Sequence, residues 1–160
     1  MGMDSVINHF LSRGLECSVT KFLNNESELY NEHKERTLET ECVGKTLAFK
    51  VRNDSILIVV SEDLKISSNK YENYFKVKPK ILTNNETIDI TGHPLEGLSP
   101  LGLKKPLKVY IDVSLKKISY IYICAGLKNF VVKVAPRELM DLTDGQWLDI
   151  CQHENSYAYH

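Results

Sequence analysis

One lysine and one glycine- and proline-rich segment are the residues of this chain best suited to do chemistry. Lys45 stands at the mouth of a predicted strand, where its ammonium group can donate to an ester or ribose oxygen or stabilise charge on a carbonyl. Residues 92–103 hold three glycines and two prolines, and such a shaped loop can point backbone N–H groups at a ligand. The simpler alternatives stay open: a surface cation and a turn between two strands.

Three more side chains in or near this segment are candidates. Ser99 lies between a leucine and a proline, and without a G-x-S-x-G elbow or a Ser-His-acid set its hydroxyl is expected to line a pocket. His93, beside a proline, is either a general base or a structural histidine. Asp112, at a predicted strand end, either fixes loop backbone or a substrate amine, or caps the turn that follows it.

Two familiar kinds of site are not predicted. Gly44-Lys45-Thr46 looks like the end of a phosphate-binding P-loop, but that motif requires glycine at position 39, where this chain has Glu39, and a helix afterwards, where a strand is predicted. The four cysteines are widely spaced, with no C-x-x-C pair and no histidine at metal-ligand spacing. The sequence therefore predicts no nucleotide triphosphatase, no metal site and no disulfide framework.

The totals are those of one globular domain. The chain has 160 residues, 42% hydrophobic and 26% charged, with a net charge of −1, which argues against wholesale coating by a polyanion but allows a local basic face. No apolar run is long enough to span a bilayer, and no signal-peptide pattern opens the chain. We expect a cytoplasmic protein without a membrane partner.

Helices are predicted from capping residues and apolar spacing. The expected helices are one capped by Asp4-Ser5 and ended by Gly14, a polar one from Ser27 to about Leu38, and shorter ones over 67–75, 85–91 and 137–142, the last begun by Pro136.

Strands are predicted from apolar runs and alternation. They cover 46–51, 55–60, 80–82, 107–112, 119–124 and 129–134, with 147–150 as an edge strand. The run 55–60 is expected to be buried on both faces and 107–112 to be half-exposed. Helices and strands interleave irregularly, which predicts one mixed α/β domain over residues 1–150, with a helical part at 1–26 and a polar tail at 151–160.

Ten lysines lie near four aromatic residues in the middle of the chain. Basic and aromatic residues in one area suit phosphate contact and base stacking on single-stranded RNA, and the alternative is a solvated lysine-rich surface. The residues are Lys65, Lys70, Lys76, Lys78, Lys80, Lys104, Lys105, Lys108, Lys116 and Lys117, with Tyr71, Tyr74, Phe75 and Tyr110.

Four segments, in this order, resemble the YbaK/EbsC/ProX family of aminoacyl-tRNA deacylases. They are Gly44 to Val51, Gly92 to Leu103, Val109 to Leu115 and Ala125-Gly126. The family is related to the editing domain inserted in bacterial prolyl-tRNA synthetases. The resemblance implies a mixed β-sheet curled into a partly open barrel with helices around it, and hydrolysis of the ester that joins a wrong amino acid to tRNA, without metal or cofactor.

The resemblance also assigns roles to individual residues. Lys45 matches the family's essential lysine, which makes it the catalytic candidate. The substrate-binding set that the resemblance implies is Thr46, Gly97, Leu98, Ser99, Pro100, Asp112, Gly126 and Asn129. The implied partners are the acceptor end of a mischarged tRNA, of the tRNA(Pro) type with a small amino acid such as cysteine or alanine, and prolyl-tRNA synthetase.

The chain departs from the commoner family pattern around the substrate. Glu96 stands where a second glycine is usual, Leu101 stands at a Phe-type position, and residues 127–130 carry Leu127, Lys128 and Phe130 in place of small polar residues. These departures either reshape specificity or mark a non-catalytic tRNA-binding or regulatory module. Hydrolysis of a different aminoacyl or acyl ester is a third reading.

Overall fold

A mixed sheet with seven strands organises the chain. The computed structural model describes residues 2–17, 19–21 and 41–152, so the helix predicted over 27–38 lies outside the described residues. The strand order is β1-β6-β5-β2-β3-β4-β7. The strands are β1 (Val19–Lys21), β2 (Glu41–Val51), β3 (Asp54–Ser61), β4 (Lys108–Asp112), β5 (Tyr120–Cys124), β6 (Phe130–Val134) and β7 (Gln146–Leu148).

The sheet mixes both pairing directions. β2 pairs antiparallel with β3, β5 with β6, and β6 with β1. β2 also pairs parallel with β5, β3 with β4, and β4 with β7. The predicted mixed α/β class is confirmed, and because β1 and β7 are the two ends of the strand order, the sheet remains open between them.

Strand β2 belongs to both halves of the sheet. Its first three residues pair with β5, and the remainder, from Gly44 onward, pairs with β3. At Gly44 a Cβ would lie 2.9 Å from Ile121 Cγ2 and 3.0 Å from Ile123 Cδ1, so only glycine allows these strands to approach so closely. The predicted strand start at residue 46 was wrong, because Gly44 marks a close approach inside the strand and not its beginning.

Four helices and two short 3-10 turns are described. The helices are α1 (Met3–Ser12), α3 (Ser68–Phe75), α4 (Asn84–Thr91) and α5 (Pro136–Thr143), and the 3-10 turns are η1 (Leu95–Gly97) and η2 (Val113–Lys117). No helix in the described part of the chain is long and apolar enough to cross a membrane.

Local capping explains where most helices begin. The Ser67 side chain accepts a hydrogen bond from the Lys70 N–H at 3.2 Å, and Thr83 forms a capping box with Glu86 at the start of α4. Pro136 occupies the first turn of α5, as predicted. For α1 the predicted Asp4-Ser5 cap was wrong: the helix begins at Met3, directly after Gly2.

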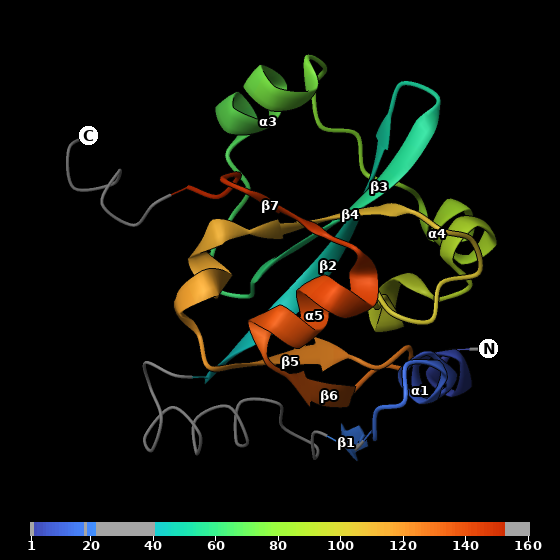
Figure 1. Ribbon diagram of the computed structural model, residues 1–160. Helices are drawn as coiled ribbons and strands as arrows, with labels where there is room; N and C mark the ends of the chain where they lie inside the picture. The colour runs from blue at the N-terminus through green and yellow to red at the C-terminus, as the bar shows by residue number, and fades with distance from the viewer. Residues whose placement is uncertain (1, 18, 22–40, 153–160) are drawn as a thin grey trace.

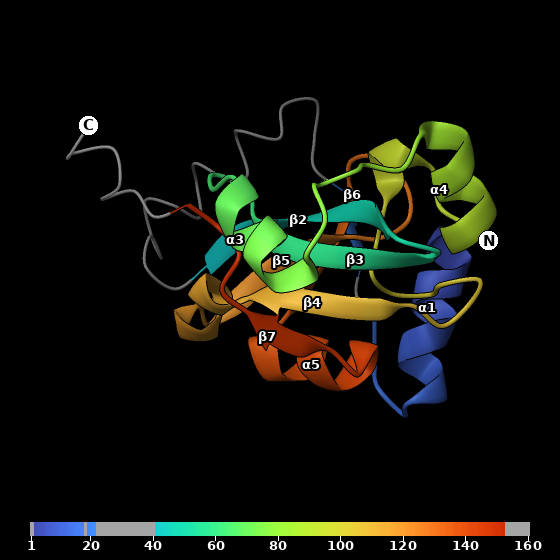
Figure 2. The same cartoon turned by 90° about the horizontal axis from the view of Figure 1, so that it is seen from above.

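The two faces of the sheet carry separate apolar cores. The larger core joins the sheet to α1 and α5 through Phe10 and Leu139, whereas the second lies under α3 through Tyr71 and Phe75. Figure 1 shows α3 above β4 and β7 in the view, with α5 and α1 below them, and Figure 2 turns the same arrangement by 90°. The prediction of a half-exposed β4 was wrong, because both faces are covered and four of its five residues are buried.

Candidate functional site

Lys45 lies in the middle of β2, opposite Val60 of β3, and not at the mouth of a strand as the sequence suggested. Its neighbours on the same face are Val43, which packs on the cluster around Tyr122, and Leu47, which packs on the core under α3. The side chain is half-buried. No ion pair or hydrogen bond joins its ammonium group to another described residue.

The positive charge of Lys45 nonetheless influences the pKa of a buried thiol, that of Cys151. Burial, and after it the carboxylate of Asp112, raise the pKa of Cys151 to about 12, while the charges of Lys45 and Lys70 oppose the shift. At neutral pH this thiol is protonated, and it is inert as a nucleophile. Cys151 is therefore not a candidate nucleophile in this part of the sheet.

Thr46 points to the opposite face of β2, because side chains alternate along a strand. Its Oγ1 is buried and has no hydrogen-bond partner among the residues that the structure describes. Lys45 and Thr46 are neighbours in sequence but serve different sides of the sheet.

The loop after α4 is tightly packed and largely satisfied within itself. The Gly97 N–H donates to Pro94 O at 3.0 Å and the Leu98 N–H to Leu95 O at 3.4 Å. Ser99 is fully buried, and its Oγ accepts from the Leu101 N–H at 3.2 Å, so this hydroxyl braces the loop. Of residues 97–100, Gly97 and Leu98 donate their N–H groups as described and Pro100 has no N–H. The Ser99 N–H therefore remains without a hydrogen bond to the described part of the chain.

Two histidines hold this loop in place. His93 is fully buried, and its Nε2 lies 2.7 Å from Leu101 O, so Nε2 carries the proton and donates to this carbonyl. The structural alternative for His93 is thus favoured over a general base. His9 of α1 accepts from the Gly102 N–H through Nδ1 at 2.9 Å. Sequence reasoning missed His9, because no local signal links it to a loop 93 residues away.

Glycines let the loop contact two other segments backbone to backbone. A Cβ at Gly97 would lie 2.8 Å from Leu127 N and 2.9 Å from Gly126 C. Gly126, at φ 90°, packs in turn on Gly2. The structure therefore brings two predicted site residues, Gly97 and Gly126, into direct contact.

Asn129 belongs to the turn between β5 and β6. It has a φ of 70°, a conformation that asparagine tolerates better than most residues. The Phe130 N–H donates to Leu127 O at 3.1 Å across this turn, and the Leu127 side chain is 45% exposed. Asn129 thus shapes the segment that packs on Gly97.

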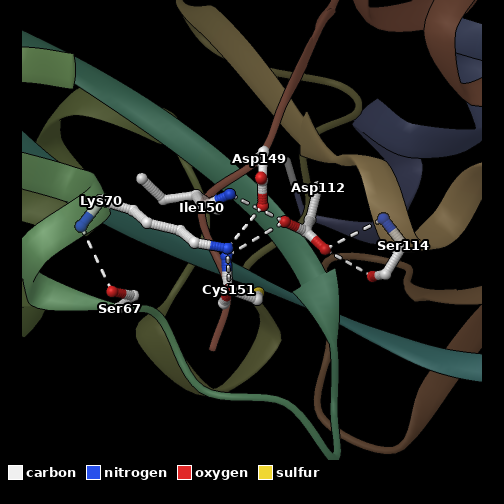
Figure 3. Close-up of polar contacts among 7 residues, drawn as sticks. All are labelled: Ser67, Lys70, Asp112, Ser114, Asp149, Ile150 and Cys151. Atoms are coloured by element: carbon white, nitrogen blue, oxygen red, sulfur yellow. Dashed lines mark hydrogen bonds and ion pairs between the residues drawn. The ribbon is translucent and has the colours of Figure 1, made fainter. Parts of the chain in front are cut away.

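Asp112 is almost fully buried, and its carboxylate is surrounded by donors (Figure 3). Oδ2 accepts from the Ser114 N–H at 3.1 Å and from the Ser114 hydroxyl at 2.5 Å. Oδ1 accepts from the N–H groups of Ile150 and Cys151 at 3.0 and 3.2 Å. The capping alternative is confirmed, since Asp112 caps η2 and also fixes the chain after β7.

The same close-up shows how α3 is tied to that segment. Lys70 Nζ donates to Asp149 Oδ1 at 2.8 Å and to Cys151 O at 2.9 Å. Asp112 of β4 and Lys45 of β2 project from the same face of the sheet, as the register and the apolar clusters show. Val60 of β3, the strand between β2 and β4, projects from this face as well. The predicted residues thus form two groups: Lys45 and Asp112 on one sheet face, and Gly97 with Gly126 at the loop.

Comparison with known proteins places this chain in a family. The model of the aminoacyl-tRNA editing domain matches residues 28–142. The chain belongs to this family, and within it to the YbaK/ProX type, which is related to the editing domains of prolyl-tRNA synthetases.

The relatives span the chain to different extents. YwhH of Bacillus subtilis, an uncharacterised protein, is 31% identical over 95% of this chain and 98% of its own. EbsC of Enterococcus faecalis, named as a candidate Cys-tRNA(Pro)/Cys-tRNA(Cys) deacylase, is 33% identical over 40% of this chain and 39% of its own.

Solved structures share the fold. A candidate trans-editing enzyme for prolyl-tRNA synthetase superposes with a TM-score of 0.80 at 22% identity, covering 94% of this chain and 97% of the other. The hypothetical protein APE2540 superposes with a TM-score of 0.76 at 19% identity, covering 92% of this chain and 99% of its own. The predicted YbaK-like architecture is confirmed.

Proposed function

We propose that this protein is a trans-acting aminoacyl-tRNA deacylase, a cytoplasmic hydrolase that removes a wrong amino acid from tRNA. The substrate we propose is a tRNA(Pro)-type molecule that carries a small amino acid such as cysteine or alanine, and prolyl-tRNA synthetase is the partner that generates it. Membership of the editing family and the name of the EbsC relative support this substrate class.

The observation that carries the proposal is the state of Lys45. A half-buried ammonium group between two apolar clusters, without an ion-pair partner among the described residues, is costly unless something else offsets its desolvation. A carbonyl or ribose oxygen of a bound aminoacyl ester would do so. We therefore assign Lys45 as the residue that polarises or positions the ester.

The loop supplies the second part of the proposed chemistry. Water attacks the ester carbonyl carbon, the bond to the ribose oxygen breaks, and that oxygen takes a proton from the attacking water. Negative charge gathers on the carbonyl oxygen during this step, and in our proposal the ammonium group of Lys45 and the N–H of Ser99 donate to this oxygen once the ester is bound. Loss of one such donor typically costs roughly 100- to 1000-fold in rate.

Editing enzymes are needed because a synthetase can distinguish similar amino acids only to a limited extent. An apolar pocket distinguishes one methylene group by only about 1–3 kcal/mol, so synthetases mischarge near-isosteres and a second sieve must hydrolyse the product. In our proposal Gly97, Leu98, Ser99 and Pro100 hold the aminoacyl group, with Thr46, Asp112, Gly126 and Asn129 completing the substrate-binding set.

We extend the proposed domain over residues 1–150. Helix α1 contributes Val6 and Phe10 to the larger core, and Leu148 and Ile150 belong to the core under α3. The proposed tail is residues 151–160, and its first residue, Cys151, still forms a bridge with Ile66.

One observation favours the second candidate, a non-catalytic tRNA-binding or regulatory module. The N–H groups of Gly97 and Leu98 are already engaged inside η1, so the loop offers fewer free donors than a full oxyanion cradle. Glu96, which is exposed beside them, adds a negative charge near the proposed ester.

A panel of mischarged tRNAs tests these alternatives. Cys-, Ala- and Ser-tRNA(Pro) are incubated with the wild-type protein, with Lys45→Ala and with Lys50→Ala, a matched control from the exposed end of the same strand. We expect hydrolysis of at least one substrate by the wild type and the control, and none by Lys45→Ala, which keeps the fold. Normal turnover by Lys45→Ala would refute the role of Lys45.

Two other outcomes separate the alternatives. Binding of tRNA without hydrolysis above the buffer rate would establish the non-catalytic module. Hydrolysis of small esters without any dependence on tRNA would indicate a different acyl substrate.

A further inference from the structure

Two cavities lie side by side at one end of the molecule. The first has a volume of about 850 Å³ and lies between α1, the end of α5 and the connection into β4. The second, of about 740 Å³, lies between the β2–β3 turn, the end of α3 and the start of β4. Both are lined by Lys105, Pro106 and Leu107, so one short segment separates them. Figure 2 shows this connection at the same end of the molecule as α1 and the β2–β3 turn.

The combined lining of the two cavities is strongly basic. Six cations line them against two carboxylates, Asp54 and Asp144, which gives a local charge of +4 in a chain whose net charge is −1. All six cations are exposed. The cations are Arg13, Arg52, Lys76, Lys104, Lys105 and Lys108.

These charges are available to a ligand. Among the described residues only Arg13 of the six has an ion pair, with Asp144 at 3.8 Å, where the acid is 87% exposed. Exposed lysines that repel one another at close quarters are stabilised by a polyanion, which also releases its counterions on binding.

The two cavities also have a fixed relation to the candidate site. Pro100 and Gly102 of the glycine- and proline-rich loop line the first cavity, so the loop proposed to hold the aminoacyl group forms one wall of that cavity. Tyr74, a residue that is 45% exposed, lines the second cavity, and an aromatic residue at the surface suits base stacking.

We propose that these two cavities form a basic track that binds the phosphodiester backbone of tRNA, with the nucleotides next to the aminoacylated end passing along residues 104–108. This inference rests on the proposed function for the identity of the RNA. It assigns a common partner to the six cations that line the cavities. Of the ten lysines in the central region, it assigns RNA contact to Lys76, Lys104, Lys105 and Lys108 and not to the other six.

Binding of uncharged tRNA tests the track without requiring catalysis. The triple variant Lys104→Ala/Lys105→Ala/Lys108→Ala is compared with the control Lys65→Ala/Lys78→Ala/Lys117→Ala, which removes three exposed lysines that line neither cavity. Affinity is measured over a series of salt concentrations, and circular dichroism checks that both variants are folded.

Three lost phosphate contacts should weaken tRNA binding roughly 100-fold at 0.1 M salt and reduce the slope of log K against log salt by about 2–3. The control should bind like the wild type. Equal losses in both variants, an unchanged slope in the track variant, or a wild-type protein that binds no tRNA would each overturn the proposal.

Steady-state hydrolysis distinguishes this proposal from the assignment of the reaction. If mischarged tRNA is a substrate, the track variant should raise KM and leave kcat unchanged. Hydrolysis with an unchanged KM would refute the track and leave the deacylase intact. Conversely, loss of tRNA binding in the track variant of a protein that hydrolyses nothing would support the track alone.

Discussion

Gly97 and Gly126 pack backbone against backbone, so that a Cβ on Gly97 would lie 2.9 Å from both the carbonyl carbon and the carbonyl oxygen of Gly126. The contact joins two segments that are 29 positions apart in the sequence, the loop after α4 and the turn after β5. It fixes the position of the loop relative to the turn after β5. Contact alone explains glycine at position 97, whereas Gly126 is explained both by contact and by its φ of 90°.

Substitution of Gly97 by alanine tests this contact. The added methyl group would meet backbone atoms of residues 126 and 127, which cannot move aside as a flexible side chain can. We expect Gly97→Ala to lower the free energy of unfolding by about 2 kcal/mol and to displace the Ser99 N–H, which would reduce deacylation. Urea denaturation and the tRNA panel measure the two effects.

Gly14→Ala provides the contrasting control. Gly14 ends α1 at φ 71°, and a Cβ there would have no neighbour within 4 Å. Backbone strain alone should cost about 1 kcal/mol, with deacylation unchanged. An equally stable, fully active Gly97→Ala protein would show that the loop does not need the close approach.

Asp112→Asn tests the buried carboxylate. Each carboxylate oxygen accepts two hydrogen bonds, so an amide NH₂ in either place would face two donors. We expect a loss of about 2–4 kcal/mol in the free energy of unfolding, because hydrogen bonds to a buried charge are lost and donors are left unpaired. Urea denaturation at neutral pH measures it.

Asp149→Asn is the matched control for this substitution. Its ion pair with Lys70, at 2.8 Å, joins a 56% exposed carboxylate to a lysine side chain that is 30% exposed, and pairs accessible to water contribute about 1 kcal/mol or less. A stable Asp112→Asn protein with a raised KM for mischarged tRNA would instead favour the role of Asp112 in binding the substrate amine.

The elements that sequence reasoning located well are those defined by local chemistry. The cap at Ser67, the proline at the start of α5 and the continuous apolar run of β3 each specify an element through residues that are adjacent in the chain. The short β1 was missed as a strand, because three residues are too few for an alternating pattern.

The errors concern contacts between distant segments. The strand over 46–51 was predicted to begin after Gly44, because the local sequence does not show that glycine is needed there to make room for the side chain of Ile121 on β5. The predicted strand over 80–82 is a single bridge between Ile81 and Phe49. Likewise, β4 was predicted to be half-exposed because the sequence does not show that α3 covers its second face.

In the candidate site, too, some features were predicted from the sequence and some contacts between distant segments were not. The resemblance selected Gly97 and Gly126 together, and the structure brings them into contact. The partners of Asp112 at positions 150 and 151 and the bond from Gly102 to His9 could not be predicted, since each joins segments tens of residues apart.

The two histidines that brace the loop predict how stability depends on pH. Burial lowers the pKa of His93 and of His9 below the ordinary value of 6.5. The folded state thus prefers both rings neutral, in keeping with His9 Nδ1 as an acceptor for the Gly102 N–H. The stability they contribute is fully present above pH 6.5 and is lost as the pH falls through the lowered folded values, because the unfolded chain binds protons first.

Variants that keep the hydrogen bonds but not the titration test this expectation. In His9→Asn the amide oxygen can accept from the Gly102 N–H, and in His93→Gln the amide nitrogen can donate to Leu101 O. We expect the urea midpoint of the wild type to fall between pH 7 and 5, and that of the double variant to fall less. A double variant with the same decline as the wild type would assign it to other groups. A flatter profile, with deacylation retained at pH 5.5, would show that the neutral histidines hold the Gly97 to Pro100 backbone in place.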